Sequence, residues 1–481
     1  MGECGAGVGA AHSTEDAVAA EARRREGAVL GLRAGRRDVL VNAEKANDTP
    51  DKVRDLQRAL YRSAKASSTR RFHALYDKMS RADILAKAWQ EVKANGGTAG
   101  VDGRSIKEIE RSGVEPFLAE LSSDLRSGTY RAQPVRRVFI PKSDGRERPL
   151  GIPTVRDRVA QAAAKVVLEP IFEADFRESS YGFRPKRNAH QAGEALRVAV
   201  NGGANWVVDA DIEAYFDRID HTRLKHLVEK RINDRRMLGL LKQWLGAGVL
   251  DDGVWSPTDQ GVPQGGVISP LLANVVLHEL DAYWEDHCRH LGQLIRYADD
   301  FVVLCWTAEA AQDAHQRVRE FLAGLGLTLH SEKTRVVDVR DGRNGFDFLG
   351  FHRRKVASRK YRGKRYLQSW PSRRAMQAVR DRINAIMAQR HRLGEPQQAI
   401  VAELNALLRG WGAYFRVGNS SRQFGQVDQY VRECLGLFAS KKAGRSGRGW
   451  GRHDEAYFTG LGVYRLSGTV GWYTAPPKAG R

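Results

Sequence analysis

The sequence predicts an α+β fold that is followed by an all-helical module. Between residues 105 and 365, short β-branched and aromatic runs alternate with helical patterns, which indicates a sheet with helices packed against it. Strand signals stop beyond Ser372, and apolar residues then recur at helical spacing. The chain has 481 residues, of which 42% are hydrophobic, so it can bury more than one core.

The charge balance favours a polyanionic partner. Lys and Arg number 78 against 57 Asp and Glu, which leaves a formal net charge of +21. No apolar run approaches the roughly 20 residues that cross a bilayer, and no signal peptide is recognisable, so we expect no membrane contact. The four cysteines form no CxxC pair, which excludes a disulfide framework and a Cys-based zinc site. These features predict a cytoplasmic protein.

Composition and spacing divide the chain into five predicted segments. Residues 1–50, rich in Ala, Gly and Arg, have too few large apolar residues to order themselves and predict a mobile basic arm. Residues 51–104 show helical spacing and predict a helical extension. The mixed region 105–365 and the basic helical region 366–440 follow. Residues 441–481 are rich in Gly and Arg and predict a tail or a docked extension.

Two carboxylates stand at the expected tip of a hairpin. In LIRYADDFVVL, residues 294–304, two short β-like runs flank Asp299 and Asp300, a spacing that is typical of a tight turn. Two adjacent negative charges repel each other, so a divalent cation that neutralises them would explain the arrangement. A turn chosen only for its polarity is the alternative. The other expected strands lie at residues 138–140, 206–211 and 334–339.

A second acidic segment follows the strand expected at 206–211. In WVVDADIEAYFDRIDH, residues 206–221, an apolar run leads into Asp209, Asp211, Asp217 and Asp220. Phosphoryl transfer with two Mg²⁺ ions about 3.5–4 Å apart needs acidic ligands from separate elements. A strand-end aspartate beside an Asp-Asp turn supplies such a set. Loop solvation is the alternative explanation for carboxylates at a strand end.

These segments carry a family resemblance. Asp211-x4-Phe216 and Tyr297-Ala298-Asp299-Asp300 resemble motifs A and C of reverse transcriptases, and LNALLRGWGAYFR (404–416) resembles the maturase motif of bacterial group II intron-encoded proteins. Five further segments resemble the successive reverse transcriptase blocks of that family. They are RERPLGIPTVRDRVAQ (146–161), SSYGFRPKRNAHQA (179–192), QGVPQGGVISPLLANVVLHELD (260–281), GLTLHSEKT (326–334) and FDFLGF (346–351). The resemblance covers roughly residues 55–440.

The resemblance implies a right-hand polymerase, with fingers and palm at 105–365 and a helical thumb, or maturase (X), domain at 366–440. It implies an RNA-directed DNA polymerase that copies intron RNA into DNA for retromobility and acts as a maturase in splicing. The implied partners are group II intron RNA, an RNA template with a DNA primer, target DNA and deoxynucleoside triphosphates. The implied place of action is the bacterial cytoplasm, with association with the nucleoid during mobility.

The resemblance also assigns residue roles. Asp211, Asp299 and Asp300 match the catalytic carboxylates, which hold two Mg²⁺ ions while a primer 3′-hydroxyl attacks the α-phosphate. Phe216 lies under the sugar and excludes a 2′-hydroxyl. Gln264, in Pro-Gln-Gly-Gly, contacts that sugar while the glycines let backbone approach the nucleotide. Ser269 is expected to cap the following helix, with Pro270 as its first residue.

Basic residues complete the expected site. By resemblance, Lys142 and Arg148 bind the triphosphate, and Lys333 is a candidate proton donor to the leaving pyrophosphate. Solvated surface charge is the alternative for all three. An apolar stripe at Met376, Val379, Ile383 and Ile386 marks a helix. Its other faces carry basic residues, of which Arg374, Arg380 and Arg382 are expected to bind the RNA backbone.

Two other functions share part of this pattern. A maturase that only folds RNA would not need the intact aspartate set. A reverse transcriptase of a defence or diversity-generating system shares the palm, but the helical stretch with LNALLRGWGAYFR disfavours it. His453 stands alone after Cys434, without the paired His and Cys metal ligands of an endonuclease module, so we expect no such domain.

Overall fold

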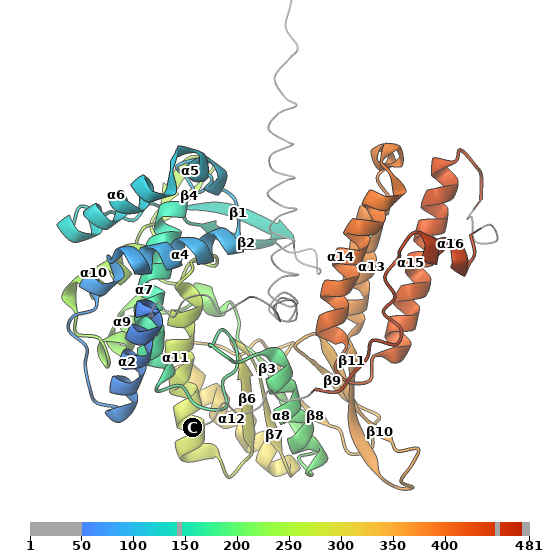
Figure 1. Ribbon diagram of the computed structural model, residues 1–481. Helices are drawn as coiled ribbons and strands as arrows, with labels where there is room; N and C mark the ends of the chain where they lie inside the picture. Colours follow the sequence, from blue (N-terminus) through green and yellow to red (C-terminus); the bar gives the residue numbers. More distant parts are fainter. Residues whose placement is uncertain (1–50, 142–146, 448–452, 474–481) are drawn as a thin grey trace, which may run out of the picture.

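The computed structural model describes residues 51–141, 147–447 and 453–473 (Figure 1). The predictions for the arm at 1–50, for Lys142 and for part of the tail therefore lie outside the described residues. Helices α2 to α12 and two of the three sheets form one group of elements, and helices α13 to α16 form a second group beside it. Strands β9 to β11 lie at the base of the second group.

The N-terminal part is helical, as predicted. Ser105 begins one of these helices with a capping box, in which its hydroxyl accepts from the backbone N–H of Glu108 and the Glu108 carboxylate accepts from that of Ser105. Helices α2 and α4 pack against α7, which is buried over most of its length. The helices are α2 (Lys52–Ala66), α3 (Tyr76–Met79), α4 (Ala82–Asn95), α5 (Ile106–Ser112), α6 (Val114–Ser127) and α7 (Val155–Glu173).

The first sheet has the strand order β2-β1-β4-β5. Strand β1 (Val135–Pro141) pairs antiparallel with β2 (Glu147–Ile152) and parallel with β4 (Val249–Asp251). Strand β5 (Val254–Ser256) closes the far edge. The β1–β2 hairpin projects towards the helices of the second group in Figure 1.

The second sheet has the order β6-β7-β3-β8, and all its pairs are antiparallel. Each strand agrees with its predicted position to within a residue, because short apolar runs mark strands that are largely buried, as in β7. Their bounds are β3 (Trp206–Asp211), β6 (Gln293–Tyr297), β7 (Asp300–Cys305) and β8 (Arg335–Asp338). The fold class predicted from the sequence is confirmed.

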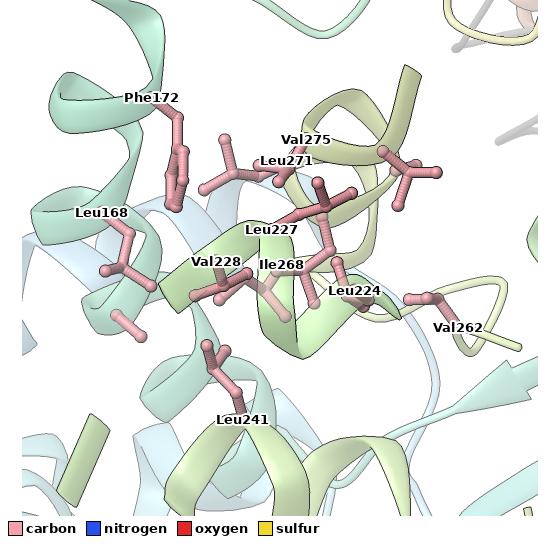
Figure 2. Packing of buried hydrophobic residues seen from close by; sticks show 14 of the residues in the cluster. Leu168, Phe172, Leu224, Leu227, Val228, Leu241, Val262, Ile268, Leu271 and Val275 are labelled. Carbon is pink, nitrogen blue, oxygen red and sulfur yellow. The ribbon is translucent and has the colours of Figure 1, made fainter. Parts of the chain in front are cut away.

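Helices that pack around this sheet form the largest core. Figure 2 shows Leu168 and Phe172 of α7 facing Val228 of α9 and Val275 of α11. Removing these side chains from water stabilises the packing by about 1.5–3 kcal/mol for each large residue. The helices of this part are α8 (Ala189–Asn201), α9 (His221–Glu229), α10 (Arg235–Leu245), α11 (Ser269–Tyr283) and α12 (Ala308–Gly324).

A third sheet, of order β11-β10-β9, was not predicted. Its strands are β9 (Gly345–Phe348), β10 (Phe351–Ala357) and β11 (Arg365–Pro371). Basic residues interrupt the apolar pattern of β10, yet Arg353 and Lys355 are buried against the first group of elements. The Tyr414 hydroxyl donates to the carbonyl oxygen of Leu349, which ties this sheet to the helices beyond it.

The second group of elements is all-helical, as predicted beyond Ser372. Ser372 accepts from the N–H of Ala375 and so begins α13, whose predicted apolar stripe is buried. Trp411 is half-buried and contacts the rings of Phe415 and Phe424. The helices are α13 (Arg373–Met387), α14 (Gln397–Phe415), α15 (Ser421–Lys442) and α16 (Glu455–Gly460).

Residues 453–473 are docked on this helical group. Phe458 and Leu466 are buried in its core. The carboxylate of Asp428 accepts from the backbone N–H groups of Leu466 and Ser467. Of the two forms expected for the tail, these residues take the docked one. No helix in the described part of the chain is long and apolar enough to cross a membrane.

Candidate active site

The three predicted carboxylates meet at the ends of neighbouring strands. Asp211 is the last residue of β3, and Asp300, the first residue of β7, lies directly opposite it in the antiparallel register. Residues opposite each other in such a pair point to the same face of the sheet. Asp299 occupies the turn that joins β6 to β7. Asp300 therefore belongs to the strand, whereas the sequence placed it at the hairpin tip.

The turn itself consists of Ala298 and Asp299, because Tyr297 and Asp300 are the last pair of the hairpin. Ala298 has a φ of +59°, a left-handed conformation that costs a non-glycine residue about 1–2 kcal/mol. Two neighbouring groups hold it there. The Arg296 guanidinium donates to the Ala298 carbonyl oxygen at 2.8 Å, and the backbone of Gly182 lies against the Ala298 nitrogen.

Arg296 is itself fully buried, and all five of its N–H donors have acceptors. Two go to Asp281 through Nε at 2.8 Å and Nη2 at 2.5 Å. The other three go to Asn274, to Ser180 and to the Ala298 carbonyl oxygen. Since a buried guanidinium is stable only when it is paired and fully hydrogen-bonded, this network fixes the strand beneath the turn.

Burial and mutual repulsion disfavour the charged forms of Asp209, Asp299 and Asp300. Burial raises the pKa of Asp300 well above its usual range, and the charges of Asp209, Asp299 and Asp211 raise it further. Burial and the charge of Asp211 also raise the pKa of Asp299. Burial raises the pKa of Asp209 to about 6, although Arg335 opposes the shift through an ion pair at 3.2 Å. A positive charge placed between the strand ends would stabilise all of these carboxylates.

Lys333 supplies one such charge. Its Nζ lies 2.7 Å from Oδ2 of Asp211. In this arrangement no three His, Cys, Asp or Glu side chains of the described residues converge closely enough to hold a metal ion. Carboxylate oxygens are nonetheless the donors that Mg²⁺ prefers, and the raised pKa values of Asp299 and Asp300 fit a site that a cation completes. If Asp211 were to bind a cation, it would have to exchange its lysine partner for the ion.

Three of the predicted nucleotide-binding residues, Arg148, Phe216 and Gln264, lie close to one another, whereas Lys142 is outside the described residues. Arg148 of β2 donates from Nε to the Gln264 side-chain oxygen at 2.5 Å, and the Gln264 amide donates to the Asp217 carboxylate at 3.1 Å. Phe216 is half-buried, and its carbonyl oxygen accepts from the N–H of Val262 at 2.7 Å. The charge of Arg148 acts to lower the pKa of Asp299, which places the arginine within electrostatic reach of the turn.

Gly265 of the Pro-Gln-Gly-Gly segment has a packing role that the sequence did not predict. Gly265 has a φ of +127°, and a Cβ there would lie 2.4 Å from the Gly151 carbonyl oxygen. The glycine thus allows the loop to approach the backbone of β2. The predicted N-cap was also wrong by one residue, because Ser269 is the first residue of α11 and its hydroxyl donates to the Pro263 carbonyl oxygen.

The three predicted RNA-binding arginines are all on α13 but do not share one face. At about 100° per residue, Arg374 and Arg382 lie roughly 80° apart around the helix, and Arg380 points elsewhere. Arg374 and Arg382 are exposed. Arg380 is half-buried, with its guanidinium 5.8 Å from the centre of the Tyr430 ring on α15. Arg374 and Arg382 are therefore better placed than Arg380 to contact a ligand.

Sequence reasoning missed the residues that support the turn. Asn274 and Asp281 are buried polar positions seven residues apart in α11, which puts them on one face of the helix. Arg296 is a charged residue inside a strand. A polar residue at a position that the periodicity marks as buried was the available signal. The identity of the partners could not be deduced, since they lie far apart in the chain.

Comparisons with known proteins agree with this geometry. Residues 140–353 match the family model described as reverse transcriptase (RNA-dependent DNA polymerase). Residues 376–458 match the model described as group II intron, maturase-specific domain. The strand-end carboxylates and the mixed fold beside a helical group thus belong to a nucleotidyltransferase of the reverse transcriptase class.

Several known proteins are similar to this chain over part of its length. Protein YkfC of Escherichia coli is 36% identical over 62% of this chain and 87% of its own length. The group II intron-encoded protein LtrA of Lactococcus lactis is 40% identical over a match that covers 44% of this chain and 35% of LtrA. The putative COX1/OXI3 intron 1 protein of Saccharomyces cerevisiae is 24% identical over 76% of this chain and 52% of its own length. The chain belongs to the family of group II intron-encoded reverse transcriptases and maturases.

Proposed function

We propose that this protein extends a DNA primer on an RNA template at the β3–β7 strand ends and uses its helical domain to bind group II intron RNA during splicing. The observation that carries the catalytic part is the pairing of Asp211 with Asp300 beside the Asp299 turn. Carboxylates from separate elements are what two-ion phosphoryl transfer requires.

The reaction joins the primer 3′ oxygen to the α-phosphorus of a deoxynucleoside triphosphate and breaks the bond to the pyrophosphate. Asp211, Asp299 and Asp300 would hold two Mg²⁺ ions, which when bound lower the pKa of the attacking hydroxyl and neutralise phosphate charge. Arg148 would bind the triphosphate, and Lys333, once released from Asp211, would donate a proton to the leaving pyrophosphate. Phe216 would exclude a sugar that has a 2′-hydroxyl, and Gln264 would contact the sugar of the bound deoxynucleotide.

The test is primer extension by an Asp299→Asn variant. Loss of an outer-shell partner of a metal typically costs 10–100-fold, so loss of a metal ligand itself should lower extension by more than about a hundredfold. The fold should be retained, because burial already disfavours the charged form of Asp299. Asp313→Asn on α12, where the carboxylate pairs with Arg317, is the matched control. Extension by Asp299→Asn within tenfold of the unaltered protein would refute the assignment.

The maturase part has a separate readout. RNA binding uses surface charge and shape, whereas polymerisation uses the carboxylates. Asp299→Asn should therefore still promote splicing of a group II intron RNA that the unaltered protein assists. Loss of splicing together with extension, in a variant whose thermal midpoint is unchanged, would contradict the separation of the two activities.

A further inference from the structure

The β10–β11 hairpin ends in an exposed segment that we call the basic hairpin tip, residues 358–366. It contains five basic residues and no acidic one, and the chain has no Asp or Glu at all from residue 349 to residue 380. Every residue from 359 to 366 is exposed. The five basic residues are Arg359, Lys360, Arg362, Lys364 and Arg365.

Hydrogen bonds give the tip a definite shape. The Ser358 N–H donates to the Lys364 carbonyl oxygen at 2.8 Å, and the Ser358 hydroxyl accepts from the N–H groups of Lys360 and Tyr361. Gly363 has a φ of +78°, which completes the turn. The positive charges are thus presented by an ordered turn, which lowers the entropy cost of binding.

None of the five basic side chains forms an ion pair with another described residue. Elsewhere on the described surface, basic residues commonly have an acidic neighbour, as in Arg317 with Asp313 and Lys225 with Glu229. Tyr361 is 48% exposed, and the Nζ atoms of Lys360 and Lys364 lie 5.4 and 5.8 Å from its ring centre. Uncompensated cations around an exposed aromatic ring suit a nucleic acid, which offers phosphates and base faces.

The tip is remote from the carboxylates. Strand β10 begins at Phe351, beside Leu349 and Gly350, and Leu349 lies next to Asp300 through a backbone hydrogen bond. Its seven residues rise about 3.3 Å each, so the tip lies roughly 20 Å farther along the strand. Figure 1 shows β10 and β11 extending away from α13 and α14. A ligand at the tip would therefore occupy a surface separate from the polymerase site.

We propose that the basic hairpin tip is a second RNA contact of this protein, which binds the phosphate backbone of folded RNA outside the polymerase site. RNA is favoured over DNA because the chain belongs to a family with a maturase-specific domain. The inference deepens the proposed function and rests on its RNA-binding part. The basic hairpin tip would contribute to RNA affinity through its positive charge, independently of the RNA sequence.

The experiment measures affinity for a 24-base-pair duplex RNA of arbitrary sequence over a series of salt concentrations. The tip variant replaces Arg359, Lys360, Arg362 and Lys364 with Gln. Each lost phosphate contact flattens the slope of log affinity against log salt by roughly 0.7–0.9, so contact by two or more residues flattens it by at least about 1.4. Affinity at 0.1 M salt should fall at least about tenfold.

Two controls make the result specific. The first control removes the same formal charge from helices α9 and α12, by placing Gln at Arg223, Lys225, Arg317 and Arg319. It should flatten the slope of log affinity against log salt by less than about 0.5, because acidic neighbours already offset part of this charge. The second exchanges Lys and Arg at the four tip positions and should keep the slope. Equal flattening in the first control would overturn the proposal, because net charge alone would then explain the effect.

The same affinity measurement is repeated with a duplex DNA of the same length. Loss of DNA binding without loss of RNA binding in the tip variant would overturn the assignment to RNA. Primer extension by the unaltered protein, run in parallel, tests the polymerase separately. Failure of primer extension would count against the proposed polymerase function. The RNA affinities of the tip and control variants could still be compared, because that measurement does not depend on polymerase activity.

Discussion

The guanidinium of Arg296 and the carboxylate of Asp281 form an ion pair in which neither side chain is exposed. The pair joins strand β6 to helix α11, and the same guanidinium donates to the Ala298 carbonyl oxygen in the turn that carries Asp299. The geometry of the carboxylate site therefore depends on a charge that is compensated within the core.

Asp281→Asn should destabilise the protein strongly, because it leaves the buried guanidinium without its counter-charge. Breaking a buried pair in this way costs about 3–5 kcal/mol, which urea denaturation would measure. Glu279→Gln is the matched control on the same helix, since Glu279 forms an exposed pair with Lys230 at 2.9 Å and should cost less than about 1 kcal/mol. Similar losses in the two variants would show that Arg296 finds another partner.

Gly182→Ala should impair primer extension although the residue carries no reactive group. A Cβ at this position would lie 2.3 Å from the Ala298 nitrogen, so the turn with Asp299 must move. We expect a loss of about 1–3 kcal/mol in unfolding free energy. Gly239→Ala on α10 meets nothing within 4 Å and should instead stabilise by about 0.5–1 kcal/mol. A Gly182→Ala variant with normal extension would show that the turn tolerates the displacement.

Phe216→Ala should admit ribonucleotides more readily, because it opens space where the sugar's 2′ position would lie. Single-turnover extension with matched deoxy- and ribonucleotides should show discrimination reduced by about 10–100-fold. Phe139→Ala, on the exposed face of β1, is the control for loss of a phenyl ring. Unchanged discrimination would remove Phe216 from the proposed nucleotide site.

Replacing both Arg374 and Arg382 with Gln should reduce the salt dependence of RNA binding. Two exposed residues that contact phosphates account for a slope change of about 1.4–1.8. Arg380→Gln should change the slope little, because its guanidinium lies over Tyr430. A larger effect of Arg380→Gln than of the double variant would place the RNA contact on the opposite face of α13.

The pH dependence of stability should include a contribution from His190. Burial lowers the pKa of this imidazole below its usual 6.5, and Nε2 lies 2.8 Å from the Tyr414 carbonyl oxygen. The unfolded chain then binds the proton more readily than the folded chain, so stability is lost as pH falls through 6.5. Between pH 7.5 and 5.5 the loss can reach at most about 1.4 kcal/mol, because pH 5.5 lies one unit below the usual pKa of an imidazole.

This prediction is checked by urea denaturation of the unaltered protein and of His190→Gln at both pH values. The variant should lack the additional loss at pH 5.5. The exposed His391 provides a control, since His391→Gln should keep the pH dependence of the unaltered protein. Identical pH profiles for His190→Gln and the unaltered protein would exclude the buried imidazole as the source.

The local pattern of apolar and acidic residues in the sequence was sufficient to predict much of the fold and to choose the candidate carboxylates. Short apolar runs located the strands that end at Asp211 and begin at Asp300, because a strand that is buried on both faces carries a nearly continuous run of apolar residues. Helical spacing located α13 with its buried stripe for the same kind of reason. The motifs that follow those elements were then enough to identify the family.

The sequence by itself thus determined the strands of the second sheet, the buried stripe of α13, the candidate carboxylates and the family of this protein. Only the tertiary structure decided that Arg296 supports the turn that carries Asp299, that Lys333 forms an ion pair with Asp211, and that β9 to β11 form a sheet. These features depend on contacts between residues far apart in the chain, and long-range contacts leave no periodic signal in the segments that make them. Arg353 illustrates the point, since a charged residue in a strand reads as exposed until the helix that buries it is in place.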